Sequence, residues 1–212
     1  MAESSIIEII DKFTEVSRKF GSSTVDVLKP CNSDDLENIR KLDSVSIPGE
    51  LHEFLSTLGD VDEDKMAELD LFEPHLVWGM SIIPVQEISE KYNDFAGCGG
   101  EENPDYWPLG FLPILEENNS NFIVINCIEN STTYGAVYDM SEGVGCNMVS
   151  KSIGAFLSAS AEELENGIRV FTGPDFSEIK NFKSYLKDAA PLFGNTPYFS
   201  RIGKMDQQII DW

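Results

Sequence analysis

The sequence predicts an α+β protein in which an antiparallel β-sheet, a meander, is flanked by helices, with a helical extension at the C-terminal end. Three observations support this fold class. Apolar residues recur at helical spacing through much of residues 5–58, short β-type runs separated by turn residues fill 110–150, and helical spacing returns over 152–165. Hydrophobic residues make up 42% of the 212 residues, which is ordinary for a folded protein with a sizeable core.

Helices are predicted at three places in the first part of the chain. The first covers residues 5–20, where Ser5 and Glu8 have the spacing of a capping box. The second begins after Ser33, and the third opens with Pro48 in its first turn. The apolar faces of these helices consist of Ile6, Ile9, Ile10, Phe13, Val16 and Phe20; of Leu36, Ile39 and Leu42; and of Leu51, Phe54, Leu55 and Leu58.

The middle of the chain mixes strand, helix and loop signals. Residues 75–83, HLVWGMSII, are strand-like, a helix begins at Pro84, and the composition of 96–108 is that of a loop. We expect Trp78 and Trp107 to pack in the core or at a sheet edge, with a binding cleft as the alternative.

Four β-type runs and a closing helix follow. The runs are FLPIL (111–115), NFIVINCI (121–128), YGAVYDM (134–140) and GCNMVS (145–150). The intervening residues ENNS, ENST and SEGV are typical of hairpin turns, which predicts an antiparallel meander. A helix is then predicted over 152–165.

The C-terminal residues differ in charge from the rest of the chain. Residues 169–212 contain six basic and five acidic side chains, which gives them a net charge of +1. Because the whole chain carries −22, residues 1–168 carry −22 − 1 = −23. A helix is predicted over 177–190, with Ile179, Phe182 and Leu186 on one stripe. We expect a domain over 1–168 and an extension over 169–212 that docks on it; a separate binding tail is the alternative.

Charge limits the classes of partner. The chain has 15 Lys and Arg against 37 Asp and Glu. Such an excess repels nucleic acid and anionic membrane surfaces and accelerates encounter with a basic partner. A role in solubility alone, or adaptation to a high-salt habitat, is the alternative.

Sequence features also bear on the compartment. MAESSIIEIIDKF lacks the basic and apolar regions of a signal peptide, and no run approaches the roughly 20 apolar residues that span a bilayer. The cysteines show neither a CxxC pair nor zinc-ligand spacing. We therefore expect a cytoplasmic protein with reduced thiols, of which Cys127 is buried.

The most acidic stretch, residues 60–73, fails a test for calcium binding. With Asp60 at position 1 of an EF-hand loop, Lys65 stands where glycine is needed and Leu71 where the bidentate glutamate is needed. A solvated acidic loop, or a face for a basic partner, is the preferred interpretation. The prediction is that the protein binds no metal.

Catalytic patterns are equally unsupported. Neither His52 nor His75 has a Ser or Cys at motif spacing, GxSxG is missing, and the glycines at 97–100 lack the Lys and Ser/Thr of a phosphate loop. The sequence therefore predicts a non-enzymatic protein with no cofactor. A hydrolase that uses two of the many carboxylates remains as an alternative.

The order of these parts resembles the SUKH superfamily (SMI1/KNR4-like proteins) over about residues 5–167. DDLENIRKLDSVSIPGELHEFLSTLGD is similar to the family's opening, with Ile47-Pro48 at its Leu-Pro-type dipeptide. WGMSIIPVQEISEKYNDF resembles the next strand and helix, WPLGFLPILEENNSNFIVIN the central hairpin, and YGAVYDM with SIGAFLSASAEELENG the last strands and closing helix. The chain departs from the family at Gly59-Asp60, which replaces Asn-Gly, and at 118–121, and its C-terminal 45 residues have no recognised counterpart in the family.

The resemblance implies a binding role. Many bacterial members are immunity proteins that neutralise toxins, and fungal members are regulatory scaffolds. We therefore expect an immunity protein with a basic toxin as its partner, and a regulatory scaffold as the alternative, which would have long disordered extensions. The candidate partner-binding residues are Asp60, Asp62, Glu63, Asp64, Glu68 and Asp70; Glu101, Glu102 and Asp105; and Glu116 and Glu117, which we place in the hairpin turn.

Overall fold

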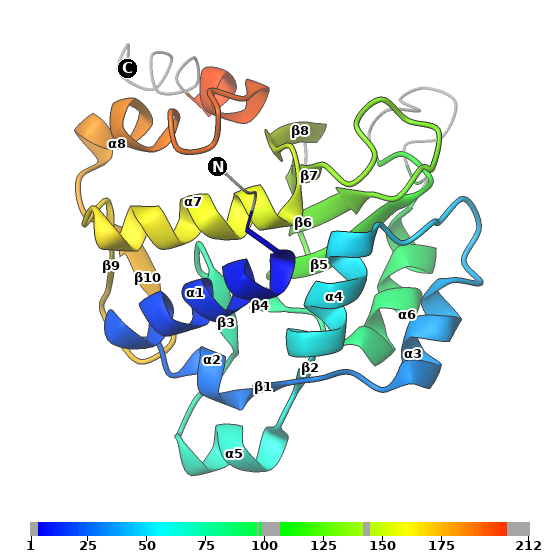
Figure 1. The fold of residues 1–212 in the computed structure, drawn as a ribbon, viewed down its shortest axis with the longest axis horizontal. Coiled ribbons are helices and arrows are strands. Elements are labelled where there is room, and N and C mark those ends of the chain that lie inside the picture. Colours follow the sequence, from blue (N-terminus) through cyan, green and yellow to red (C-terminus); the bar gives the residue numbers. More distant parts are fainter. Residues whose placement is uncertain (1–3, 97, 99–106, 142–144, 203–212) are drawn as a thin grey trace.

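The computed structural model describes residues 4–96, 98, 107–141 and 145–202 of the chain. In these residues, six strands form one antiparallel sheet whose spatial order follows the chain, which confirms the predicted α+β fold with a meander (Figure 1). The strands are β3 (His75–Val77), β4 (Met80–Ile82), β5 (Phe111–Glu117), β6 (Asn121–Asn126), β7 (Val137–Ser141) and β8 (Gly145–Ser150).

Helices surround this sheet. They are α1 (Ile6–Lys19), α2 (Thr24–Val27), α3 (Ser33–Ile39), α4 (Gly49–Leu58), α5 (Glu63–Glu68), α6 (Val85–Phe95), α7 (Ile153–Glu165) and α8 (Phe182–Ala189). Two further antiparallel pairs join β1 (Leu28–Lys29) to β2 (Asp60–Val61) and β9 (Arg169–Phe171) to β10 (Ser177–Ile179).

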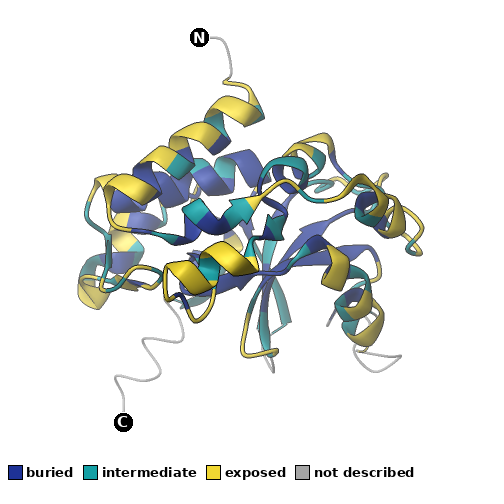
Figure 2. Ribbon diagram, turned by 90° about the horizontal axis from the view of Figure 1, so that it is seen from below, coloured by how far each residue is buried: buried dark blue, intermediate teal, exposed yellow. Residues whose placement is uncertain are grey.

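Both faces of the sheet are covered. After Asn121, every residue of β6 is buried, and side chains of a strand alternate between its two faces. The Phe122 ring lies 5.2 Å from that of Phe95 on α6 and 5.0 Å from that of Trp107. Figure 2 accordingly shows much of the sheet in the colour of buried residues, with intermediate residues on outer strands such as β8, between helices with exposed outer faces.

The first helix forms as predicted. The Ser5 hydroxyl accepts a hydrogen bond from the Glu8 N–H, and the Glu8 carboxylate accepts one from the Ser5 N–H at 2.8 Å. This capping box satisfies backbone donors that the first helical turn leaves unpaired. The buried face of α1, with Ile10, Phe13 and Val16, lies along α7 (Figure 1).

The single strand predicted over residues 75–83 is wrong. The segment is a tight hairpin, because Trp78 and Gly79 have φ angles of +58° and +76° and turn β3 back into β4. Positive φ at a residue as bulky as tryptophan is uncommon. The pattern of apolar residues did not indicate a turn here, since tertiary contacts of the Trp78 ring hold this conformation.

The helix predicted over 177–190 begins later than expected. Residues 177–179 form β10, and α8 starts after Asn181, whose side chain accepts a hydrogen bond from the Lys183 N–H. Ile179 is therefore in a strand, and Phe182 is 72% exposed. Sequence analysis also missed α2, β1 and the β9–β10 pair, because each is too short to show a period.

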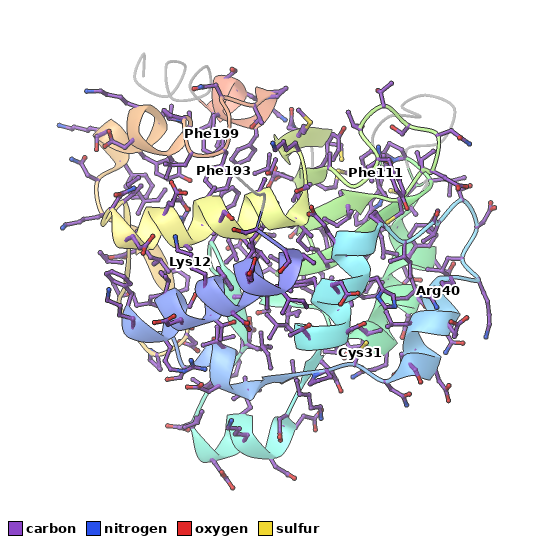
Figure 3. All side chains as sticks on the ribbon, viewed as in Figure 1. Lys12, Cys31, Arg40, Phe111, Phe193 and Phe199 are labelled. Atoms are coloured by element: carbon purple, nitrogen blue, oxygen red, sulfur yellow. The ribbon has the colours of Figure 1, made fainter. Side chains whose placement is uncertain are left out.

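The C-terminal segment contributes to the main core. In this segment, residues 169–202, the side chains of Phe193 and Phe199 lie on the side that faces α7 (Figure 3). The Phe193 ring is 6.1 Å from that of Phe156 on α7, and the Phe199 ring is 6.4 Å from that of Trp78. The division into a domain over 1–168 and a docked extension stays a prediction.

The thiols of Cys31, Cys98, Cys127 and Cys146 are free. Cys127 is fully buried, as predicted, and burial raises the pKa of its thiol to about 12. Because the thiolate is the reactive form, this group is inert at neutral pH.

Candidate functional site: an open acidic pocket beside α5

The acidic stretch is partly ordered structure and not a loop throughout. Residues 60–61 pair with β1, and α5 follows. Asp60 lies 3.6 Å from Lys29, and the Asp62 side chain caps α5 by accepting a hydrogen bond from the Lys65 N–H at 3.1 Å. These two candidate residues therefore stabilise the local fold.

The other candidates in this stretch are free to interact. Glu63, Asp64, Glu68 and Asp70 are exposed and make no ion pair with the residues that the structure describes. In Figure 2, α5 is seen as an almost wholly exposed helix. Carboxylates that do not hold the fold are available for a partner.

Glu116 and Glu117 lie in the last residues of β5, so placing them in the hairpin turn was wrong. The turn itself contains Asn118 and Asn119, whose φ angles are +53° and +54°. Asparagine tolerates this left-handed conformation better than glutamate does. The Glu116 carboxylate is 2.5 Å from the Lys91 ammonium, which also donates to Asn119 Oδ1 at 2.8 Å.

The third group of candidates, Glu101, Glu102 and Asp105, lies outside the described residues.

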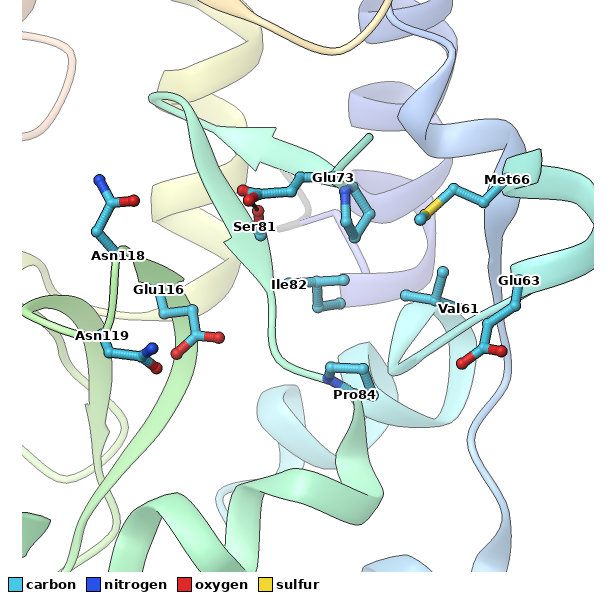
Figure 4. A pocket seen from close by; sticks show the side chains of 11 residues that line it. Val61, Glu63, Met66, Glu73, Ser81, Ile82, Pro84, Glu116, Asn118 and Asn119 are labelled. Carbon is cyan, nitrogen blue, oxygen red and sulfur yellow. Dashed lines mark hydrogen bonds between the residues drawn. The ribbon is translucent and has the colours of Figure 1, made fainter. Parts of the chain in front are cut away.

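An open pocket of about 390 Å³ joins the two described groups of candidates (Figure 4). Ile82 of β4 lies in the middle, with Val61, Met66 and Pro84 beside it. The polar residues that line the pocket are Glu63 from α5, Glu73 and Ser81 along one edge, and Glu116, Asn118 and Asn119 on the side opposite α5. We refer to this feature as the α5 pocket.

Glu73 makes two polar contacts at the edge of the α5 pocket. Its Oε2 accepts a hydrogen bond from the Ser81 hydroxyl at 3.1 Å and lies 3.1 Å from Nε2 of His75. The carboxylate, not the imidazole, contacts the serine, so this arrangement differs from that of a nucleophilic triad. Glu73 ends the acidic stretch that was predicted as a face for a basic partner, but it was not among the individual candidate residues.

A second polar cluster forms around Trp78, and its charged members were not predicted from the sequence. The Glu163 side chain on α7 is fully buried, and its Oε2 accepts a hydrogen bond from Nε1 of Trp78 at 2.7 Å. Arg169 Nε lies 3.3 Å from the same oxygen, and its guanidinium lies 5.5 Å from the ring centres of Trp78 and Tyr185.

Burial raises the pKa of Glu163, while Arg169 and then Trp78 oppose that rise. No sequence signal marked Glu163, because its partner Trp78 lies 85 residues away in the chain. Among the described residues, the cavity at this cluster is only about 10 Å³, and the cluster joins α7, the β3–β4 turn and the C-terminal residues.

The described part of the chain lacks both a candidate metal-binding cluster and a candidate membrane-spanning helix. No group of three or more His, Cys, Asp and Glu side chains is arranged to hold a metal ion there. No helix in that part is both long and apolar enough to cross a membrane.

The fold and the pocket define a class of protein: an α+β protein with one meander sheet and an open acidic pocket at its edge. Residues 30–159 match the model of the SMI1 / KNR4 family (SUKH-1), and this is more than half of the chain. The chain therefore belongs to that family, which confirms the resemblance noted in the sequence. The matched region runs from before α3 into α7. A search of curated proteins found no match to the chain.

Proposed function

We propose that this chain is a cytoplasmic immunity protein that binds and neutralises a cognate toxin domain with a basic surface, without catalysing a reaction. The observation that carries the proposal is the position of the uncommitted carboxylates. The carboxylates of α5 lie beside the α5 pocket, and Glu63, Asp64 and Glu68 make no ion pair with the described residues.

Electrostatics favours such a partner. A toxin that acts on nucleic acid needs Lys and Arg to contact phosphates, and a carboxylate-rich surface can cover those residues. Complementary charge also accelerates encounter, which matters for an inhibitor that must act before its target does damage. The net charge of −22 adds to this steering.

Exposed apolar side chains at the same place argue against a surface that serves solubility alone. Leu69 and Phe72 follow α5 and are 41% and 86% exposed. The Phe72 ring contacts no other ring in the described structure. Aromatic residues surrounded by polar groups are typical of protein interfaces.

Co-expression with the reading frame next to this gene, which the proposal expects to encode a toxin domain, tests the proposal. We expect cells that express both proteins to grow, cells that express the toxin domain alone to die, and the two proteins to purify as a complex. Failure of both protection and co-purification would contradict the proposal.

Family membership equally supports a regulatory scaffold of the SMI1/KNR4 type. A scaffold would bind its partner in the same assay but would not restore growth, so the growth readout separates the two functions.

A further inference from the structure

The α5 pocket combines an apolar floor with charged walls. Ile82 is 3% exposed and Val61 9%, and they lie with Met66 and Pro84 between carboxylates on different sides (Figure 4). A small anion is disfavoured by the carboxylates, and a purely apolar group would leave them desolvated and unpaired. The occupant that satisfies both parts has an apolar stem and a cationic end.

We propose that the α5 pocket receives one arginine side chain of the partner and thereby anchors the complex. This inference rests on the proposed function in that it takes the partner to be a basic protein. The methylene stem packs on Ile82, Met66 and Pro84, and the guanidinium bonds to Glu63 and Glu73. Long basic side chains commonly bury their stems on apolar surface in this way.

The charges on the pocket walls suit one additional cation. Three carboxylates line the pocket, and one of them, Glu116, is already paired with Lys91 at 2.5 Å. This internal ion pair also holds Asn119, so that wall is fixed before a partner arrives. Glu63 and Glu73 are left without a lysine or arginine among the described residues.

Arginine fits better than lysine for a geometric reason. The guanidinium carries five N–H donors in a plane, so it can donate to carboxylates on more than one side at once. A lysine ammonium is a compact charge that is more strongly hydrated and satisfies one carboxylate at a time. Glu73 is already oriented by Ser81 and His75, which reduces the entropy lost when it binds a cation.

The test uses the full chain and three blocked pentapeptides, Gly-Gly-X-Gly-Gly, in which X is arginine, lysine or citrulline. Titration is followed by the amide and methyl signals of the ¹⁵N- and ¹³C-labelled protein. We expect saturable shifts at Ser81, Ile82 and Asn119 with the arginine peptide, at millimolar concentrations typical of a single side chain (about 1–10 mM). The lysine peptide should bind several-fold more weakly, and the uncharged citrulline peptide at least about 10-fold more weakly.

The double variant Glu63→Gln/Glu73→Gln should abolish these shifts. The matched control, Asp11→Asn/Glu15→Gln, removes the same charge from the exposed face of α1 and should preserve them. Three results would each overturn the inference. They are equal binding of the arginine and citrulline peptides, shifts that lie elsewhere on the molecule, and titrations in which the arginine peptide gives no saturable shift or gives the same shifts with the double variant. Unchanged thermal unfolding of the double variant would show that the fold is retained.

A second measurement separates this inference from the proposed function. If this chain protects cells from the toxin domain and co-purifies with it as proposed, the Glu63→Gln/Glu73→Gln variant should bind the toxin domain at least about 10-fold more weakly than the control variant does. Unchanged affinity would overturn the pocket as anchor and leave the immunity function intact. A protein that binds the arginine peptide but no toxin would instead contradict the proposed function alone.

Discussion

Nε1 of Trp78 donates a 2.7 Å hydrogen bond to Oε2 of Glu163, and this bond ties the turn of the β3–β4 hairpin to α7. The indole also stacks on Tyr198 at 5.5 Å, so the same residue connects the hairpin to the C-terminal segment. A residue with positive φ, a buried carboxylate and the C-terminal segment are thus held at one point. Stability at this point can be tested separately from binding at the α5 pocket.

Replacing Glu163 with alanine should strongly destabilise the protein. The change leaves the Arg169 guanidinium, itself largely buried, without its carboxylate, and breaking a buried pair in this way costs about 3–5 kcal/mol. Urea unfolding measures the loss. The control Glu165→Ala, on the same helix, removes only a solvent-exposed pair with Lys12 and should cost less than about 1 kcal/mol. Equal losses would show that the buried pair has no special role.

Replacing Gly79 with alanine tests the hairpin turn. Gly79 has φ of +76°, and a Cβ there would lie 2.8 Å from the Phe176 ring. Both effects should destabilise the protein, together by about 1–3 kcal/mol. The control Gly49→Ala, at the start of α4 where no atom lies within 4 Å of the new Cβ, should be neutral or stabilise by about 0.5 kcal/mol. Thermal unfolding of the two variants under the same conditions makes the comparison.

The Asp139 carboxyl should make stability depend on pH between about 4 and 6. Burial raises its pKa from 3.8 to about 6, against the opposing hydrogen bond from the Ser141 hydroxyl. In this window the folded state holds a proton that the unfolded state has lost, so the free energy of unfolding decreases as pH rises.

Asp139→Asn removes this dependence while an amide oxygen can still accept from Ser141. The stability of the variant relative to the natural protein should therefore rise by about 2–3 kcal/mol from pH 4 to pH 7. Chemical unfolding at a series of pH values measures it, with Asp11→Asn as an exposed control. A difference that stays flat across the series would contradict the assignment.

Phe72→Ala should weaken partner binding without altering stability. The ring is 86% exposed, so its removal should change the free energy of unfolding by less than about 0.5 kcal/mol. If it packs against the partner, affinity should fall about 10-fold or more. The control Phe182→Ala removes another exposed ring, 72% exposed at the start of α8, and should leave affinity unchanged. Isothermal titration with the toxin domain distinguishes the two sites.

Charge reversal on α5 should act on the rate of association. Asp64→Lys/Glu68→Lys should slow association roughly 10-fold or more at low ionic strength, and the difference should shrink as salt screens the surface charges. Asp11→Lys/Glu15→Lys, a pair with the same spacing on α1, is the matched control. Equal slowing in both variants, measured by stopped flow, would mean that total charge matters and the α5 surface does not.

Much of the fold was predictable from local pattern. The capping box at Ser5 and Glu8, the apolar face of α1 and the β-type runs of β5 to β8 each carry their own signal, because periodicity reflects burial on one face or both. The β3–β4 turn and β10 were not predictable, since a two-residue turn and a three-residue strand leave no period. The position of Glu116 on a strand depended on where the Asn118-Asn119 turn begins.

The candidate site was predictable in composition but not in arrangement. The sequence by itself determined that carboxylates are dense over residues 60–73 and recur at Glu116, and that the chain resembles the SUKH superfamily. Only the tertiary structure decided that Asp60 and Asp62 stabilise the local fold, that Glu63, Glu73 and Glu116 line one pocket, and that Glu163 is buried against Trp78. The reason is physical: charge and periodicity are local properties of a chain, whereas a pocket and a buried ion pair form between segments that only folding brings together.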